Sequence, residues 1–231
     1  MIRDKIEGDK GQVYIDNKVY YYKRNDAYLE IFMQRIADFF QLHHAEYTPT
    51  TYKGLNYYLS EDLNNKGFFR TAYDAGIDTY DFNIILAIAK ERFNDPTIIE
   101  DLYKMYFMDL MTLNIDRNND NYGFLTKDDK TSLYVFDHGC CFLDYLCLLT
   151  SITNKLDNSS LQEIDYIIKN FDKEHFQLFL DMYNSLDINT FKKIITDTED
   201  VINRDLPYKE YYISGYEFLR DRTLTRSKVL R

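Results

Sequence analysis

The sequence contains no tryptophan, only three prolines and eight glycines, and no long apolar run. So few prolines and glycines argue against a structureless linker, and no internal period suggests a repeat array. No stretch approaches the roughly 18 apolar residues that a membrane-spanning helix needs. The charged N-terminus MIRDKIEGDKG also lacks the apolar segment of a secretory signal. We therefore expect a cytoplasmic protein that has no contact with a membrane.

Cysteine is scarce as well. The chain has three cysteines, Cys140, Cys141 and Cys147, an odd number of which two are adjacent. This arrangement suits no ordinary disulfide framework. The absence of a CxxC or Cys/His pattern gives no support to a zinc site. The number and spacing of the cysteines therefore agree with a protein in a reducing compartment.

Positive charge is outnumbered, with 28 Lys and Arg against 38 Asp and Glu and a net charge of −10. Bulk electrostatics therefore argue against direct binding of nucleic acid. The exception is the final segment FLRDRTLTRSKVLR, whose net charge of +4 leaves −14 for the rest of the chain. We interpret it as a solvated last helix whose cations suit a helix C-terminus. A phosphate or partner site is the alternative.

What the chain has in quantity is apolar and aromatic residues, at 45% and 16%, with 22 tyrosines and 16 phenylalanines. This composition excludes wholesale disorder. At 231 residues, the chain is long enough to bury a sizeable core in one or two domains.

The first sixty residues predict two hairpins around one helix. QVYI and KVYYYK alternate or run apolar and are separated by Asp16-Asn17, a good hairpin turn. AYLEIFMQRIADFFQL follows with apolar residues at helical spacing. The segment AEYTPTTYKGLNYYLSEDL then predicts two more short strands, which are separated by a turn at Lys53-Gly54. These elements form a small α+β lobe.

From about residue 78 the pattern is mostly helical. DTYDFNIILAIAKERF predicts one helix, and Asp95-Pro96 opens the next with a cap and a proline at the first helical position. YGFL and SLYVF, joined by TKDDKT, predict a hairpin. Everything after residue 143 reads as helical, with periodic stretches near 174–186, 189–203 and 208–227. We place the boundary between two lobes at residues 62–67, which gives domains 1–64 and 65–231.

Polar residues interrupt this apolar pattern in NIDRNNDNYGFL, residues 114–125, and again at Asp137. Adjacent antiparallel strands bring the start of one strand next to the end of the other. Asn121 and Asp137 can therefore converge, although they are far apart in sequence. A carboxylate facing a carboxamide makes a hard oxygen site that suits Mg²⁺.

A calcium site of the EF-hand type is the competing interpretation, because Asp116, Asn118 and Asp120 match its opening D-x-N-x-D. That loop also needs glycine at its sixth position and a bidentate glutamate at its twelfth. These positions hold Asn121 and Lys127. The sequence therefore excludes an EF-hand.

DRNNDN at 116–121 resembles the D-R-H-x-x-N catalytic loop of HipA-type Ser/Thr kinases and, more distantly, of phosphatidylinositol-3/4-kinase-like proteins. DHG at 137–139 resembles their metal-binding D-x-G. The resemblance implies a two-lobed, protein-kinase-like α+β fold, with a small antiparallel-sheet lobe bearing one helix and a mostly helical C-terminal lobe. It also implies an ATP- and Mg²⁺-dependent kinase in which Asp116 is catalytic and Asn121 and Asp137 bind the metal. Asn118 departs from the family, which usually has histidine there.

Kinases also need a strand lysine that reaches the nucleotide phosphates and a helix glutamate that holds it. Lys23 near a strand end and Glu30 early in the following helix occur in that order. Each has a simpler interpretation, Lys23 as a strand-end charge and Glu30 as a favourable acid in a first helical turn. Arg117 could pair with a carboxylate or a phosphate near the loop, and we favour a structural role.

Two further features complete the expected nucleotide site. Gly8 and Gly11 could form a turn whose backbone N–H groups cover the phosphates, although two glycines between strands are more often only a turn. The connection from Leu59 to Asp62 would be the hinge beside the adenine ring, by analogy of position.

The acceptor of the phosphoryl group stays open at this point. The resemblance implies Ser or Thr of a protein, including this protein itself, and leaves room for a regulatory protein partner. A small-molecule phosphotransferase uses Asp and Asn residues in the same pattern and is an alternative. A nucleotide-binding pseudokinase that acts by contact, and a helical protein whose Asp/Asn loop is a simple turn, are the remaining alternatives.

Overall fold

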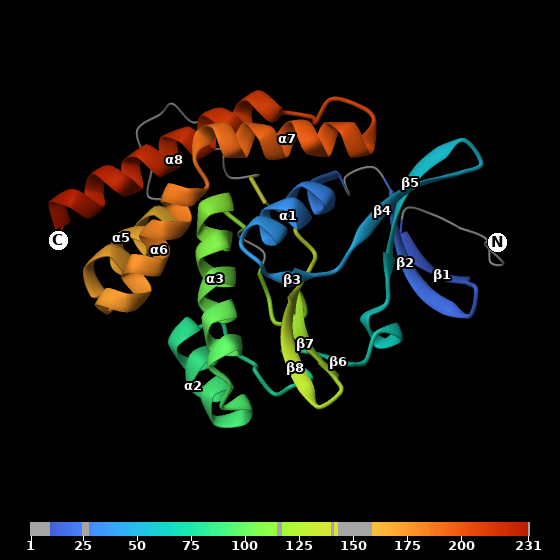
Figure 1. The fold of residues 1–231 in the computed structure, drawn as a ribbon, viewed down its shortest axis with the longest axis horizontal. Helices are drawn as coiled ribbons and strands as arrows, with labels where there is room; N and C mark the ends of the chain where they lie inside the picture. The colour runs from blue at the N-terminus through green and yellow to red at the C-terminus, as the bar shows by residue number, and fades with distance from the viewer. Residues whose placement is uncertain (1–9, 25–27, 115–116, 140, 143–158, 231) are drawn as a thin grey trace.

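The computed structural model describes residues 10–24, 28–114, 117–139, 141–142 and 159–230. Gly8 and Asp116 lie outside the described residues, as do Cys140 and all of residues 143–158, which include Cys147 and were expected to be helical. The described chain is mixed α+β, with two four-stranded sheets beside a group of helices (Figure 1). The fold class expected from the sequence is confirmed.

The first sheet is antiparallel and has the order β1-β2-β5-β4. Its strands are β1 (Lys10–Ile15), β2 (Lys18–Arg24), β4 (Tyr47–Tyr52) and β5 (Leu55–Glu61). Both predicted hairpins are present. Their turns at Asp16-Asn17 and Lys53-Gly54 have positive φ at both central residues, as two-residue hairpin turns require.

The second sheet has the order β3-β8-β7-β6. It contains the predicted hairpin as β7 (Tyr122–Lys127) and β8 (Lys130–Val135). The turn is shorter than expected, because Asp128 and Asp129 alone form it, both with positive φ. The other two strands, β3 (His43–His44) and β6 (Phe68–Thr71), were missed because two and four residues are too few to show a periodic pattern.

The helices agree well with the sequence-based expectations. The predicted cap Asp95 opens the third helix and Asp81, which was not singled out as a cap, opens the second, since each carboxylate accepts backbone N–H groups of the first turn. The elements are α1 (Tyr28–Phe39), η1 (Leu63–Asn65), α2 (Phe82–Phe93), α3 (Pro96–Thr112), α5 (Ser159–Asn170), α6 (Lys173–Ser185), α7 (Ile188–Ile202) and α8 (Lys209–Leu230). Asp81 and Asp95 show that local cap chemistry fixes where these helices begin.

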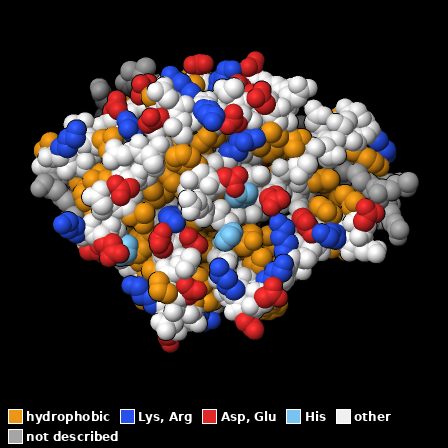
Figure 2. Space-filling model, viewed as in Figure 1, with side chains coloured by type: hydrophobic (Ala, Val, Ile, Leu, Met, Phe, Trp, Pro, Cys, Tyr) orange, Lys and Arg blue, Asp and Glu red, His pale blue; other side chains and the backbone are white. Residues whose placement is uncertain are grey.

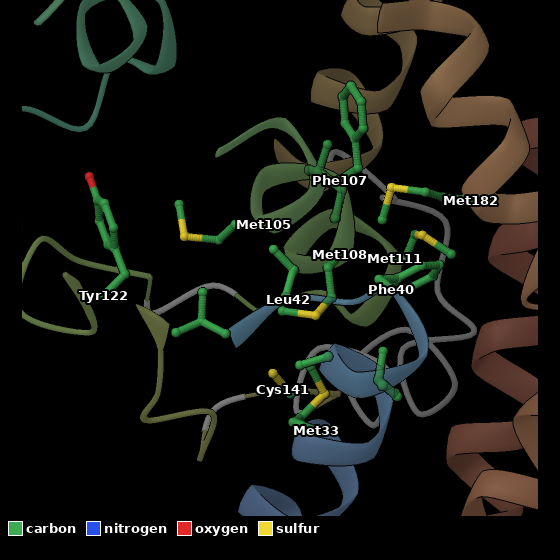
Figure 3. Packing of buried hydrophobic residues seen from close by; sticks show 14 of the residues in the cluster. Met33, Phe40, Leu42, Met105, Phe107, Met108, Met111, Tyr122, Cys141 and Met182 are labelled. Carbon is green, nitrogen blue, oxygen red and sulfur yellow. The ribbon is translucent and has the colours of Figure 1, made fainter. Parts of the chain in front are cut away.

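One large apolar core joins α1 to the C-terminal helices. Phe32 of α1 packs edge-on against Phe191 of α7, with ring centroids 5.5 Å apart. Methionines of α1, α3 and α6 meet in the same core (Figure 3). A second, much smaller cluster of Val13, Tyr22 and Tyr57 lies on the first sheet. The helix expected in the small lobe therefore packs against the large one, and β3 likewise pairs with β8.

The basic C-terminal segment lies in α8, and several of its cations bind other helices. Arg226 donates to Asp165 of α5 at 2.6 Å, and Arg222 lies 3.2 Å from the same carboxylate. The Nε of Arg220 donates to the carbonyl of Tyr183 in α6. The segment is the last helix, as expected, but these arginines bind α5 and α6 and are not simply solvated cations at the end of their own helix.

The surface carries charges of both signs, interspersed with apolar side chains on the face shown in Figure 2. Across the described part of the chain, no helix combines the length and the apolar character needed to cross a membrane.

Candidate active site

Lys23 lies between two carboxylates near the end of β2, an interior strand of the first sheet. Its Nζ is 2.7 Å from Oε1 of Glu30 and 2.8 Å from Oδ1 of Asp137. Glu30 is 2% exposed and accepts a second hydrogen bond, through Oε2, from the backbone N–H of His138. The strand lysine, the helix glutamate and the aspartate of DHG, separated by up to 114 residues, thus meet at one point.

Electrostatics favour a charged lysine in this cluster. Burial alone would lower the pKa of Lys23, but the charges and hydrogen bonds of Glu30 and Asp137 outweigh burial and raise it. Burial raises the pKa of Glu30, against the opposing effects of Lys23 and the His138 N–H. With all three groups ionised, the cluster carries a net charge of −1.

Arg117 forms the second ionic contact of the site, and all five of its N–H groups are used. Nε and one Nη2 N–H bind the Asp109 carboxylate at 2.8 and 2.9 Å. Nη1 donates to the carbonyls of Asn121 and Phe136 at 2.7 and 2.8 Å, and the other Nη2 N–H faces His138 Nδ1 at 3.0 Å. A guanidinium has five donors, so none remains for a ligand. The structure supports the structural role for Arg117.

The Arg117 contacts position the two candidate metal ligands through the backbone. The carbonyl of Asn121 also accepts from the N–H of Phe136, so the end of the loop and the end of β8 are joined directly. Asp137 follows at once, with a left-handed φ of 55° and a side chain that is 49% exposed. Asn121 itself is buried, at 6% exposure. The strand pairing that predicted their convergence is therefore present.

A cavity of about 370 Å³ opens beside Lys23 and Asp137. Its walls come from the first sheet, from the connection after β5, and from the ends of β6 and β8, and include Tyr47, Phe69 and Phe136. The Lys23 Nζ lies 5.8 Å from the centre of the Tyr47 ring. Volume and position suit a small-molecule ligand whose charged end reaches Lys23.

The hinge residues divide between the cavity and the opposite face of the sheet. Asp62 lines the cavity, and its carboxylate also caps η1 by accepting from the Asn64 backbone N–H at 2.8 Å. Leu59 packs instead with the small cluster that contains Tyr22. Leu59 is therefore not brought to the cavity.

Gly11 also lies away from the cavity, in β1 opposite Tyr22. A Cβ at this position would be 2.6 Å from the Tyr22 hydroxyl oxygen. The glycine thus makes room for the Tyr22 ring. This packing is sufficient to account for glycine at position 11. Its predicted role in binding phosphate stays a prediction.

Sequence reasoning missed Asp109 and His138. Asp109 is a lone acid inside the apolar run MDLMTLN at the end of a helix, and this position indicates that it is buried. Because a buried carboxylate requires a partner, it could have been identified as a structural residue. Burial and the nearby Arg117 charge lower the pKa of His138 well below its ordinary value. A neutral His138 accepts the Arg117 hydrogen bond through Nδ1.

The residues present fit a divalent cation shared with a phosphate. Within the described ranges, no group of three or more His, Cys, Asp or Glu is arranged to hold a metal. Mg²⁺, however, commonly takes one or two protein oxygens and completes its shell with water and phosphate oxygens. The half-exposed Asp137 carboxylate offers such an oxygen, and Asn121, whose backbone carbonyl accepts from the N–H of Phe136, the residue before Asp137, is the second candidate ligand.

Two solved structures share this fold. The crystal structure of the Helicobacter pylori proinflammatory kinase CtkA matches with a TM-score of 0.68 at 17% identity, over 96% of this chain and 94% of that one. HipA of Shewanella oneidensis MR-1, from its complex with HipB and operator DNA, matches with a TM-score of 0.61 at 10% identity, over 100% of this chain and 67% of that one. No protein-family model and no curated sequence matches the chain. The chain therefore has a kinase-like, two-lobed fold, as its resemblance to HipA-type kinases implied.

Proposed function

We propose that the protein is an ATP- and Mg²⁺-dependent phosphotransferase that moves the γ-phosphate of ATP to a hydroxyl group. The observation that carries the proposal is the contact of Lys23 with both Glu30 and Asp137 at the edge of a cavity of about 370 Å³. A kinase-like fold places these residue types together for phosphoryl transfer. A bound Mg²⁺ would offset the negative charge on the β- and γ-phosphates.

Under this proposal, each residue of the candidate site has a distinct role. Lys23 binds the α- and β-phosphates, and Glu30 holds its ammonium group in place. Asn121 and Asp137 hold the cation, while Arg117 fixes the backbone on which both stand. By position in the D-R-x-x-x-N loop, Asp116 orients the acceptor hydroxyl and takes its proton.

The charges around the cavity make the cation a requirement for binding. Glu61, Asp62, Asp74 and Asp137 line the cavity together with a single lysine, Lys23. The Lys23 charge is already compensated by Glu30 and Asp137. A polyphosphate without a divalent cation would meet net repulsion here. ATP should therefore bind only as its Mg²⁺ complex.

For the acceptor we propose Ser or Thr of a protein, including this chain itself. The support is the resemblance of the 116–121 and 137–139 segments to HipA-type Ser/Thr kinases. A small-molecule phosphotransferase uses the same residues and is the alternative. A pseudokinase would bind Mg-ATP without transferring phosphate.

Intact-mass measurement after incubation with Mg-ATP tests the proposal. The wild-type protein should gain the mass of one or more phosphoryl groups, and Asp116→Ala should gain none. Equal gain in both proteins would contradict the role of Asp116. If the wild type gains nothing and also fails to bind Mg-ATP, the proposed function is wrong.

A further inference from the structure

Tyr47 lies on the wall of the cavity that also contains Lys23 and Asp137. In the first sheet, Tyr47 of β4 pairs with Ser60 of β5, and Ser60 pairs in turn with Tyr21 of β2. Side chains at paired positions share one face of a sheet, and so do side chains two residues apart on one strand. The register therefore places Tyr47 and Lys23 on the same face, with β5 between their strands.

The ring of Tyr47 contacts the ammonium group of Lys23. The Lys23 Nζ lies over the ring, 5.8 Å from its centre. A lysine ammonium within about 6 Å of a ring centre is attracted by the negative face of the ring. Glu30 and Asp137 accept hydrogen bonds from the same ammonium at 2.7 and 2.8 Å. The ring is thus a third neighbour of the ammonium, beside the two carboxylates.

Tyr47 is held in place independently of Lys23. Although β4 is an edge strand of the first sheet, the backbone N–H of Tyr47 donates to Oε1 of Gln34 in α1 at 2.8 Å. The partly buried Tyr47 side chain also packs against the large apolar core. Lysine, in contrast, carries its ammonium on a flexible four-carbon stem. A fixed ring beside a flexible stem restricts where the ammonium lies.

The phenol of Tyr47 stays neutral in this position. Burial, followed by the charges of Glu30 and Asp137, raises its pKa well above the ordinary value of 10. The backbone N–H of Asp137 interacts with the phenol oxygen and opposes this rise only in part. Tyr47 therefore offers a ring face to the cluster without adding a negative charge.

The ring contact becomes more important once a cation is bound. Under the proposed function Asp137 binds that cation, so Glu30 is the carboxylate that remains beside the Lys23 ammonium. Resting on that function, we propose that Tyr47 is a positioning residue whose ring holds the Lys23 ammonium at the cavity wall, where the nucleotide phosphates bind. Tyr47 acts through Lys23 and takes no part in the transfer itself.

Calorimetric titration with Mg-ATP tests this role in two variants of Tyr47. Tyr47→Leu removes the ring but keeps an apolar side chain, and its affinity should fall about fivefold, the usual worth of one cation–ring contact. Tyr47→Phe keeps a ring and loses only the hydroxyl. Its affinity should stay within about twofold of the wild type, because phenylalanine also attracts a cation to its face.

Tyr52 and Lys53 supply a matched control in the same sheet. The Lys53 Nζ lies 5.3 Å from the centre of the Tyr52 ring, at the turn between β4 and β5. Neither residue is among those that line the cavity. Tyr52→Leu also removes a ring beside a lysine, and the affinity for Mg-ATP should stay unchanged. Thermal unfolding of each variant checks that it is folded.

Protein with ¹³C-labelled lysine gives a readout that does not depend on stability or on nucleotide. Protons over the face of an aromatic ring resonate upfield of their ordinary position. The ε-methylene signal of Lys23, identified by its loss in Lys23→Met, should therefore lie upfield in the wild type. It should stay upfield in Tyr47→Phe and return to the ordinary lysine position in Tyr47→Leu.

Equal losses of affinity in Tyr47→Phe and Tyr47→Leu would overturn the role of the ring, and so would an unchanged affinity in Tyr47→Leu or a matching loss in Tyr52→Leu. An ordinary Lys23 signal in the wild type would also overturn it, and that result stands even if Tyr47→Leu does not fold. Failure of the phosphotransferase proposal is a different result, because the wild type itself would then fail to bind Mg-ATP.

Discussion

The Arg117–Asp109 pair and the Lys23–Glu30–Asp137 cluster both join a cation to carboxylates, but they differ in access to solvent. The side chains of Arg117 and Asp109 are 10% and 8% exposed, against 30% for Lys23 and 49% for Asp137. Arg117 has no donor left over, whereas Lys23 faces the cavity. The closed pair can only hold the backbone in position. The open cluster can exchange one carboxylate contact for a phosphate.

The largest effect should come from breaking the closed pair. Asp109→Asn removes the charge that compensates Arg117 and disturbs the contact with Asn114. Removing one partner of a buried ion pair costs about 3–5 kcal/mol because the other charge stays buried. We expect a loss of that size in the free energy of unfolding, measured with urea. A loss below about 1 kcal/mol would show that the pair is not structural.

The same chemical change in the open cluster should act on ligand binding and spare stability. Asp137→Asn leaves the Lys23–Glu30 contact in place, and asparagine tolerates the left-handed φ of 55° at this position. We expect the affinity for Mg-ATP to fall by more than about a hundredfold, since even outer-shell changes at metal sites cost 10–100-fold. Calorimetric titration gives the affinity.

Urea unfolding of Asp137→Asn supplies the control for this comparison. The free energy of unfolding should change by less than about 1 kcal/mol, because exposed ion pairs contribute little. Unchanged Mg-ATP affinity, or a stability loss as large as that of Asp109→Asn, would remove the distinction between the two clusters.

Asp101 is a buried carboxylate whose neighbouring cation lies at the limit of ion-pair distance, and it extends the comparison to pH dependence. Asp101 lies 3.9 Å from Lys104, and burial raises its pKa from 3.8 to about 6. The folded state therefore holds this proton more tightly than the unfolded state, and stability falls as the pH rises from about 4 to 6. Asp101→Asn should raise the free energy of unfolding above pH 6 by about 1–3 kcal/mol. Urea unfolding at pH 4 and pH 7 tests this, and an equal change at both values would contradict it.

The smallest effect should come from an exposed ion pair near the cavity. Lys18 lies 2.7 Å from Glu61, with 51% of its side chain exposed. Lys18→Met should change the free energy of unfolding by less than about 1 kcal/mol. A larger loss, measured under the same urea conditions, would mean that surface pairs here resemble the buried one.

The sequence predicted the elements whose signals are local. The turns Asp16-Asn17 and Lys53-Gly54 and the cap Asp95 act through their own backbone neighbours. The two-residue strand β3 has no such signal, because it exists only by pairing with a strand about 90 residues later along the chain.

The site divides in a similar manner. The kinase resemblance led us to expect that Glu30 holds Lys23, and the hairpin between β7 and β8 led us to expect that Asn121 and Asp137 converge; the contact of Lys23 with Asp137 was not predicted. The sequence signal for Asp109 indicates a buried acid that needs a partner, but it does not identify Arg117 as that partner, because their contact exists only once the helix is packed. The opposite orientation of Leu59, toward Tyr22, depends on strand register, since a shift of one residue moves every side chain of a strand to the other face.

The most direct test of the account is a calorimetric titration of ATP into the wild-type protein, with Mg²⁺ and again with EDTA. We predict saturable binding with Mg²⁺ and none with EDTA, because the cavity carboxylates outnumber its one lysine. Equal binding in both titrations, or binding in neither, would contradict the assignment of the Lys23–Glu30–Asp137 cluster as a site for Mg²⁺-bound nucleotide.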